Sequence, residues 1–269
     1  MSALNHPNIV KVHASENKRT ERGVEIMVVM EYCPGACPPT KHAWAAAHLW
    51  LRAATHPPSC CHCCPPPPPG GHLLARINKQ QETGRPLPYE KVLEVFANVA
   101  RPVAYLHAQS PPITHRDLKF ENVLIALDGS LRLCDFGSAS THSGVPETRE
   151  DRAACEDDIT RFTTPHFRSP EMVDLYSGLA LDERGDVWAL GCLLYGLAYF
   201  KHPFLEAGPL AILAGRYRLP YAPAYPLPIT TAIRACLQVR PDDRPTAAAL
   251  LAYAEACARA PAGGPFPPP

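Results

Sequence analysis

Residues 115–122 read His-Arg-Asp-Leu-Lys-Phe-Glu-Asn, and Asp135-Phe136-Gly137 follows with Asp135 thirteen residues after Asn122. The amide oxygen of Asn122 and the carboxylate of Asp135 are hard ligands of the kind that Mg²⁺ prefers. Taken singly, such residues are more often a solvent-facing Asp after a turn, or an Asn that bonds its own loop backbone. The joint pattern favours a site with chemistry.

This order of residues resembles the catalytic core of protein kinases. The resemblance implies transfer of the ATP γ-phosphoryl group, which needs a carboxylate to orient a hydroxyl and accept its proton, and oxygen atoms to hold Mg²⁺. By position, Asp117 matches the base, whereas Asn122 and Asp135 match the metal ligands. Lys119 matches the lysine that neutralises the transferred phosphate in serine/threonine kinases. Thr164 matches the threonine that bonds the base and this lysine, so the resemblance implies Ser or Thr substrates in proteins.

Other positions match structural residues of the same family. Ser169-Pro170-Glu171 stands where kinases have Ala-Pro-Glu, and Arg244 matches the arginine that pairs with this glutamate. Asp186 matches the carboxylate that holds the backbone of the catalytic loop from beneath. His115 and Arg116, which open the loop, are also expected to be structural.

One subfamily, the Numb-associated kinases, is similar over longer stretches. These stretches are Leu133–Ala139, Asp157–Thr164, Phe167–Gly178 and Trp188–Tyr195. The subfamily includes the adaptor-associated and cyclin-G-associated kinases, and the similarity extends over roughly residues 5–35 and 71–257. It implies protein substrates such as clathrin-adaptor subunits.

The resemblance predicts an α/β (α+β) fold of two lobes, with an incomplete N-terminal β lobe and a nearly complete helical C-terminal lobe. No G-x-G-x-x-G occurs, and neither Lys11 nor Lys18 lies in a Val-Ala-Ile-Lys-like strand. Leu4–Val10 resembles the turn after the kinase helix that carries the glutamate partner of that lysine, so an N-terminal truncation is expected. The alternatives are a non-catalytic, pseudokinase-like binding module and a gene-model fragment.

The composition divides the chain into four predicted parts. They are an N-lobe remnant and hinge (1–35), a Pro/Cys/His-rich insertion expected to be disordered (36–70), the C-lobe (71–258) and a Pro-rich disordered tail (259–269). Joining Gly35 to Gly71 would restore an ordinary kinase hinge, so the insertion resembles translated non-coding sequence. At this hinge, Met30 would gate the adenine pocket of ATP, and Glu31 and Cys33 would offer it backbone groups.

The insertion also raises the alternative of a zinc site. Its cysteines have the spacings Cys60-x-x-Cys63 and Cys61-x-x-Cys64, with His62 between them and Cys33 and Cys37 upstream. Five prolines follow these cysteines directly, and no second well-spaced pair completes a tetrahedral set. Zinc is therefore not expected.

Hydrophobic spacing predicts the secondary structure. Strands are expected at 9–13, 24–32, 123–127 and 131–134, and helices at 89–107, 187–200, 230–237 and 246–258, with a long polar loop over 137–158. Pro102 conflicts with the first helix, because it lacks the N–H of a helical hydrogen bond. The apolar character of 187–200 on nearly every side indicates a helix surrounded by protein.

The charge balance, the apolar runs and the cysteine pattern limit the possible classes of function further. The 26 Lys and Arg residues balance 26 Asp and Glu residues, so a basic nucleic-acid clamp is not expected. No stretch reaches the length of a membrane span; the closest, Ala43–Ala54, is short and carries His48 and Arg52. The N-terminus has no signal-peptide pattern. The 11 cysteines are clustered or scattered rather than arranged for disulfides. We therefore expect reduced thiols and a cytoplasmic location.

Overall fold

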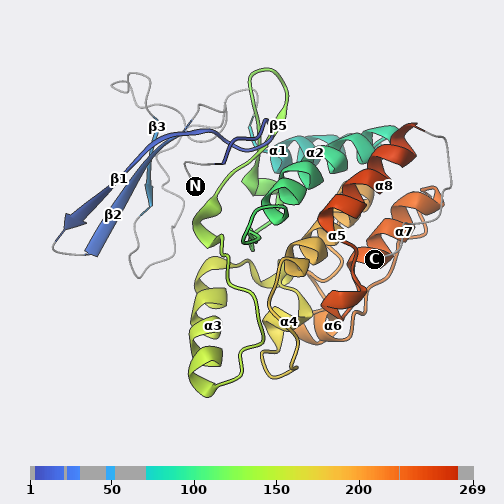
Figure 1. Ribbon diagram of the computed structural model, residues 1–269. Coiled ribbons are helices and arrows are strands. Elements are labelled where there is room, and N and C mark those ends of the chain that lie inside the picture. Colours follow the sequence, from blue (N-terminus) through green and yellow to red (C-terminus); the bar gives the residue numbers. More distant parts are fainter. Residues whose placement is uncertain (1–3, 21–22, 31–46, 52–70, 224, 260–269) are drawn as a thin grey trace.

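The structure is a computed structural model that describes residues 4–20, 23–30, 47–51, 71–223 and 225–259. It combines a body of helices with a small three-stranded sheet at one side (Figure 1). This arrangement confirms the predicted α/β (α+β) class with a helical C-terminal lobe. None of the helices in the described part of the chain combines the length and apolar character needed to cross a bilayer.

The three-stranded sheet is antiparallel in the order β1 (Val12–Thr20), β2 (Gly23–Met30) and β3 (Ala47–Leu51). The prediction of a first strand at 9–13 was wrong in its bounds. Ile9 forms an isolated parallel bridge to Leu133, and β1 runs on through the polar residues that were expected to separate two strands. Backbone ladder bonds to β2 extend β1 in this way, because they do not depend on side-chain polarity.

Strand β3 lies inside the predicted insertion 36–70, and the rest of that insertion lies outside the described residues, as does the tail from residue 260. The predicted domain boundaries therefore stay predictions.

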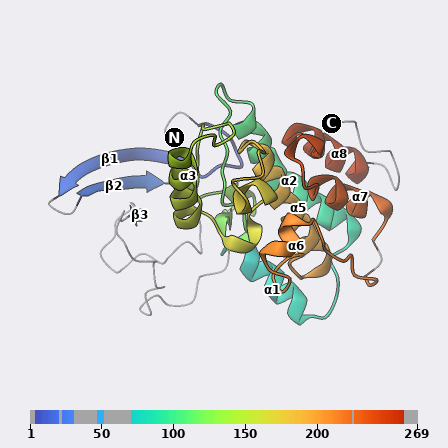
Figure 2. The ribbon, with the colours of Figure 1, turned by 90° about the horizontal axis from the view of Figure 1, so that it is seen from below.

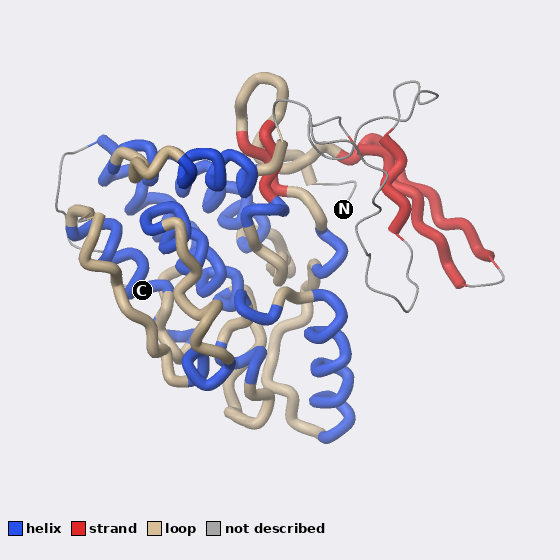
Figure 3. The backbone as a smooth tube through the Cα atoms, turned by 180° about the vertical axis from the view of Figure 1, so that it is seen from behind, coloured by secondary structure: helices blue, strands red, loops and turns tan. Residues whose placement is uncertain are grey.

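The helical body is built on two long helices, α2 (Tyr89–His107) and α5 (Arg184–Tyr199) (Figures 1 and 3). α2 packs against α5 and α8, and α5 packs against α7. The other helices of this body are α1 (Leu73–Glu82), α4 (Pro170–Val173), α6 (Pro209–Leu213), α7 (Leu227–Cys236) and α8 (Ala247–Arg259). α2 continues through the buried Pro102, so the expected conflict does not end the helix.

Helix α5 is the centre of the core, as its apolar sequence predicts. Every residue from Gly185 to Tyr199 is buried, and each fully buried large apolar side chain contributes roughly 1.5–3 kcal/mol. Close packing depends on two glycines of this helix. A Cβ at Gly191 would lie 2.6 Å from Cβ of Cys236 on α7, and one at Gly196 would lie 2.7 Å from the ring of Phe120. Gly196 thus allows the catalytic-loop segment to pack directly on the core.

Helix α3 (Arg149–Phe162) corrects the prediction of a polar loop over 137–158. Thr148 caps its N-terminus in a capping box with Asp151, and Asp157 pairs with Arg161 one turn later at 3.0 Å. These local interactions stabilise a helix without an apolar stripe, and only Ile159 of α3 is buried. The hydrophobic spacing of this segment therefore gave no indication of a helix. α3 stands at the edge of the helical body that lies toward the sheet (Figure 2).

A two-stranded hairpin, β4 (Val123–Ile125) and β5 (Leu131–Leu133), lies between the two motifs. Its turn holds Gly129 at φ +81°, as the Asp128-Gly129 signal predicts. The Val10 N–H donates to the Leu133 carbonyl at 2.9 Å, so the N-terminal segment docks on β5. The hairpin fixes the distance between Asn122 and Asp135, which lie just outside its two strands.

Candidate active site

The catalytic-loop segment runs from His115 through a 3₁₀ turn, Phe120–Asn122. The side chains of Leu118 and Phe120 are buried, and Phe120 packs on α5 at Gly196. These apolar contacts hold the loop against α5, whose residues from Gly185 to Tyr199 are all buried. Lys119, which lies between them, faces its polar partners Thr164 and Asp117.

Asp117 is the centre of a compact hydrogen-bond network. One carboxylate oxygen, Oδ1, accepts from the Thr164 hydroxyl at 2.7 Å and from the Thr164 N–H at 3.2 Å. The other, Oδ2, accepts from Nδ2 of Asn122 at 3.0 Å and pairs with Nζ of Lys119 at 2.7 Å. Lys119 also donates to the Thr164 hydroxyl at 2.9 Å. The structure thus brings together four of the predicted residues, although Thr164 lies 47 positions from Asp117.

This network fixes the orientation of the Asp117 carboxylate. Asp117 is 8% exposed, and four donors surround its carboxylate. Asn122 bonds Asp117 through Nδ2 at both the side chain and the carbonyl. Its Oδ1 therefore remains available as a ligand among the described residues.

Asp135 is exposed and lies two residues after the end of β5. Its backbone has φ +60°, and its Oδ1 accepts from the Gly137 N–H at 3.3 Å, which caps a 3₁₀ turn over Phe136–Ser138. The Cys134 N–H donates to the Asn122 carbonyl at 2.9 Å. This backbone hydrogen bond joins one predicted metal ligand, Asn122, to the residue that precedes the other, Asp135. Left-handed backbone angles cost a non-glycine residue about 1–2 kcal/mol. The hairpin holds Asp135 in this conformation.

The donor set of Asn122 and Asp135 suits Mg²⁺. Mg²⁺ is commonly bound by one or two protein oxygens together with substrate phosphates and waters. In the described part of the chain, no group of three or more His, Cys, Asp or Glu side chains gathers as a complete metal site. One buried amide oxygen, of Asn122, and one exposed carboxylate, of Asp135, lie beside Asp117 and fit a metal that arrives with a nucleotide.

Asp186 holds the start of the catalytic loop from the N-terminal turn of α5. Its carboxylate accepts from the N–H groups of His115 and Arg116 at 2.7 and 2.8 Å, and it contacts Nε2 of His107 at 3.0 Å. Burial alone would raise the pKa of Asp186, but the hydrogen bond and charge of His107, together with His115, hold the pKa below its ordinary value. His107, the last residue of α2, was not predicted as a site residue.

The Arg116 and His115 side chains connect this loop to the segment after β5. Nε2 of His115 lies 3.1 Å from the Cys134 carbonyl. Nε of Arg116 donates to the Ser138 carbonyl at 2.5 Å, and its Nη1 bonds the carboxylate of Asp158 on α3. Sequence reasoning missed Ser138 and Asp158, because α3 was expected to be loop and no local pattern links it to position 116.

Glu171 and Arg244 form a buried ion pair 73 positions apart in sequence. Nη1 and Nη2 of Arg244 each donate to one carboxylate oxygen at 2.7 Å, and the two side chains are 0% and 1% exposed. The guanidinium also lies over the Trp188 ring, 5.2 Å from its centroid. The pair therefore fastens the α4 segment to the C-terminal helices.

The predicted adenine side of the site is not placed. Met30 ends strand β2, and its side chain, like Glu31 and Cys33, falls outside what the structure describes. The cysteines and histidine of the zinc alternative, residues 37 and 60–64, also lie outside the described residues.

Comparison with known proteins agrees with this geometry. A profile of the protein kinase domain matches residues 67–254. A probable serine/threonine-protein kinase of Dictyostelium discoideum is 36% identical over 253 residues, which cover 93% of this chain and 27% of that protein. Actin-regulating kinase 1 of Saccharomyces cerevisiae is 41% identical over 161 residues, 60% of this chain and 25% of that protein. The serine/threonine-protein kinase ppk30 of Schizosaccharomyces pombe is 40% identical over 155 residues, 58% and 16% of the two chains. The chain spans less than a third of the length of each of these relatives.

Proposed function

Because this chain belongs to the protein kinase family, we propose that it transfers the γ-phosphoryl group of ATP to Ser or Thr hydroxyls of protein substrates. One observation carries the proposal: the Asp117 carboxylate is bonded by Lys119, Asn122 and Thr164 in a single network. Such a constellation orients a hydroxyl for in-line attack and accepts its proton. The relatives named above as serine/threonine kinases support the same substrate hydroxyls.

Each residue of the network has a distinct task in the proposed reaction. Asp117 orients the incoming hydroxyl and takes its proton, and Thr164 keeps that carboxylate in one orientation. Lys119 offsets the negative charge that develops on the transferred group. Asn122 and Asp135 would hold Mg²⁺, which when bound neutralises charge on the phosphate oxygens.

We also propose a place in the Numb-associated subfamily, with clathrin-adaptor-like proteins as the substrate class. The activation-segment residues 157–164 and 167–178 support this by resemblance. Actin regulation, which is part of the names of two Saccharomyces cerevisiae relatives, describes those relatives and is not proposed for this chain. Four described cysteines, Cys155, Cys192, Cys236 and Cys257, carry free thiols. Free thiols support the proposal of a reducing, cytoplasmic compartment.

A second candidate function is a non-catalytic binding module. It is favoured by the absence of a Gly-rich loop and of a Val-Ala-Ile-Lys-like strand from this sequence, since these parts grip the phosphates in active kinases. A chain without them keeps the network around Asp117 but loses its main phosphate clamp. A gene-model fragment of a longer kinase accounts for the same observation.

The test combines ATP–Mg²⁺ binding, measured by thermal shift, with radiolabelled phosphate transfer to an adaptor-type substrate. Asp135→Ala should lower Mg²⁺-dependent nucleotide binding by about tenfold or more, because a metal ligand is lost. Asp117→Asn should leave binding within about twofold and lower transfer by roughly 10²–10⁴-fold. Asp242→Asn, an exposed change remote from the network, is the matched control.

The outcomes separate the candidates. Binding and transfer that appear only after a Gly-rich loop and strand lysine are added to the chain would support the fragment account. An absence of both even in that extended chain would contradict the catalytic proposal and leave the binding module.

A further inference from the structure

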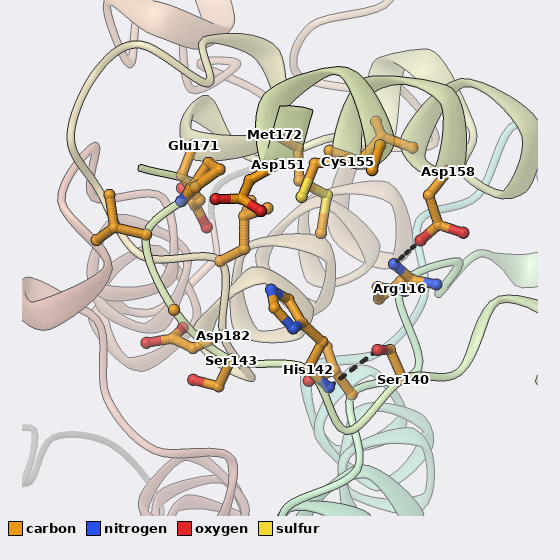
Figure 4. A pocket seen from close by; sticks show the side chains of 17 residues that line it. Arg116, Ser140, His142, Ser143, Asp151, Cys155, Asp158, Glu171, Met172 and Asp182 are labelled. Carbon is orange, nitrogen blue, oxygen red and sulfur yellow. Dashed lines mark hydrogen bonds and ion pairs between the residues drawn. The ribbon is translucent and has the colours of Figure 1, made fainter. Parts of the chain in front are cut away.

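A cavity of about 560 Å³ lies between α3, the loop 140–146 and the residues that precede α5 (Figure 4). Its volume is in the range of sites that bind small molecules. The residues proposed for phosphate transfer do not line it, although Arg116, the neighbour of Asp117, belongs to its wall. The proposed reaction therefore makes no use of this space.

Two antiparallel backbone bridges hold the loop that forms one wall of the cavity. Thr114 and Ser140 exchange both N–H···O bonds, at 2.8 and 2.9 Å, and Gly144 exchanges both with Leu181, at 3.1 and 2.9 Å. The loop 140–144 is thus fixed to the start of the catalytic loop at one end and to the segment before α5 at the other. A wall that is already held in place lowers the ordering cost of binding a ligand.

The inner wall of the cavity is apolar. Pro146, Ile159 and Met172 line it and are buried, whereas Val145 lies exposed at the rim. Cys155 of α3 adds a half-buried thiol to the lining, and burial raises the pKa of this thiol. A ligand that enters the cavity would therefore remove apolar surface from water on both sides of the contact.

Two carboxylates of the lining carry a charge that no ion pair balances among the described residues. Glu171 and Asp158 also line the cavity, but each is paired with an arginine. Asp151, at the exposed rim, and Asp182, which is half-buried, form no ion pair in the described part of the chain. Arg116, the arginine of the lining, is already used by Asp158. The cavity as a whole therefore favours a positively charged ligand.

The two carboxylates also keep hydrogen-bonding capacity for a ligand. Oδ1 of Asp182 accepts from the Arg184 N–H at 2.8 Å, and Oδ2 of Asp151 accepts from the Thr148 N–H at 3.1 Å. A carboxylate has room for further donors beyond one such bond. Burial raises the pKa of Asp182 because its charged form is desolvated. A bound cation offsets this desolvation, since an opposite charge nearby favours the ionised form.

We propose that this cavity is a binding site for a small organic cation with an apolar body, such as an aryl amidinium or ammonium ion. The charge of the ligand pairs with Asp151 and Asp182, and its body lies against Ile159 and Met172. The site is distinct from the phosphate-transfer network and does not depend on it.

The test uses the whole chain and measures occupancy at Cys155. Iodoacetamide alkylates this thiol at about pH 8, and the tryptic peptide Ala153–Arg161, which carries Cys155 as its one cysteine, reports the rate by mass spectrometry. Benzamidine is the probe, because it is an aryl cation that pairs with a carboxylate through two N–H groups as arginine does. It should slow alkylation of Cys155 by about threefold or more, with half the effect at a concentration on the order of millimolar.

Two analogues of the probe separate charge from apolar contact. Benzamide has the shape of benzamidine without its charge, and acetamidine has the charge without the ring. Each should need a concentration about fivefold higher or more for the same protection, because one loses the charge-assisted hydrogen bonds and the other loses the buried ring. Equal protection by either analogue would overturn the proposal.

Paired variants test the two carboxylates. The double change Asp151→Asn/Asp182→Asn removes both charges and keeps an oxygen at each position for the backbone N–H that it accepts. It should weaken protection by benzamidine about fivefold or more. The matched control, Asp157→Asn/Glu183→Gln, removes two charges from neighbouring residues that do not line the cavity and should leave protection unchanged. Unaltered protection in the Asp151→Asn/Asp182→Asn chain would overturn the proposal.

Cys192 controls for a general change in stability, because this thiol is fully buried and reacts only when the chain opens. Alkylation of Cys192 should not depend on benzamidine within about twofold at concentrations that protect Cys155. Equal slowing at the two cysteines would mean that the probe does not act at the cavity, and would overturn the proposal. No part of this test uses phosphate transfer, so a failure of the proposed function is distinguished from a failure of this inference.

Discussion

Removal of the Glu171 carboxylate should destabilise the fold severely, because it strands a buried charge. Arg244 uses all five of its N–H donors. Two donate to Glu171 at 2.7 Å, and the other three donate to the carbonyls of Gln238, Arg184 and Val239 at 2.8, 2.9 and 3.0 Å. Glu171→Ala leaves two of these donors and the positive charge without a partner at 0% exposure. We expect a loss of about 3–5 kcal/mol in the free energy of unfolding.

The assay is urea unfolding followed by circular dichroism at 222 nm, with equal denaturant slopes as the condition for comparison. The control is Glu94→Ala, which breaks the exposed Lys91–Glu94 pair; its N–O distance of 2.8 Å is close to that of the buried pair, but its side chains are 43% and 58% exposed. That change should cost about 0.5 kcal/mol or less. Since small domains are stable by only about 5–15 kcal/mol, Glu171→Ala should leave a marginal fold.

The result that would refute this reasoning is a loss for Glu171→Ala below about 1 kcal/mol, or one equal to that of Glu94→Ala, because desolvation of the pair would then carry no cost when it is broken. A double change of Glu171 and Arg244 to methionine offers a further check. It should be less destabilising than Glu171→Ala alone, since no charge remains buried.

Two further predictions concern the packing of the helical lobe. Burial lowers the pKa of His202 from 6.5 to about 3. As the pH falls, the unfolded chain therefore binds a proton at this residue before the folded chain does. The free energy of unfolding consequently rises with pH between about pH 3 and pH 6.5. Lowering the pH from 7 to 5 should cost the unchanged chain about 2 kcal/mol more than His202→Asn, measured by urea unfolding, and an equal loss in both would contradict the burial argument. Gly191→Ala should lower the free energy of unfolding by about 1–3 kcal/mol, because the added Cβ would lie 2.6 Å from Cβ of Cys236; an unchanged midpoint in the same assay would mean that α5 and α7 separate without cost.

Secondary structure could be predicted from the sequence where the local signals were strong. The apolar spacing of α2 and the fully apolar α5 identified both helices to within a few residues. The Asp128-Gly129 turn identified the β4–β5 hairpin. α3 was missed, because a helix held by a capping box and polar pairs lacks the periodic apolar stripe on which such a prediction depends.

The residue types of the candidate site were evident from the sequence alone, since Asp117, Lys119, Asn122 and Asp135 occur in recognisable order and chemistry. Their partners were harder to find. Thr164 was proposed only by resemblance, and His107 and Asp158 were not proposed at all. These contacts bridge 47, 79 and 42 positions of chain.

By itself, then, the sequence determined which groups are present and which local elements carry them, because helix periodicity, turn chemistry and motif order are encoded over short distances. Only the tertiary structure decided which atoms meet. Packing of α5 against the catalytic loop, and of α3 beside it, brings Asp186 and Asp158 to the two sides of Arg116. Hydrogen bonds act over about 3 Å, so a site built from distant segments exists only once the core has placed those segments together.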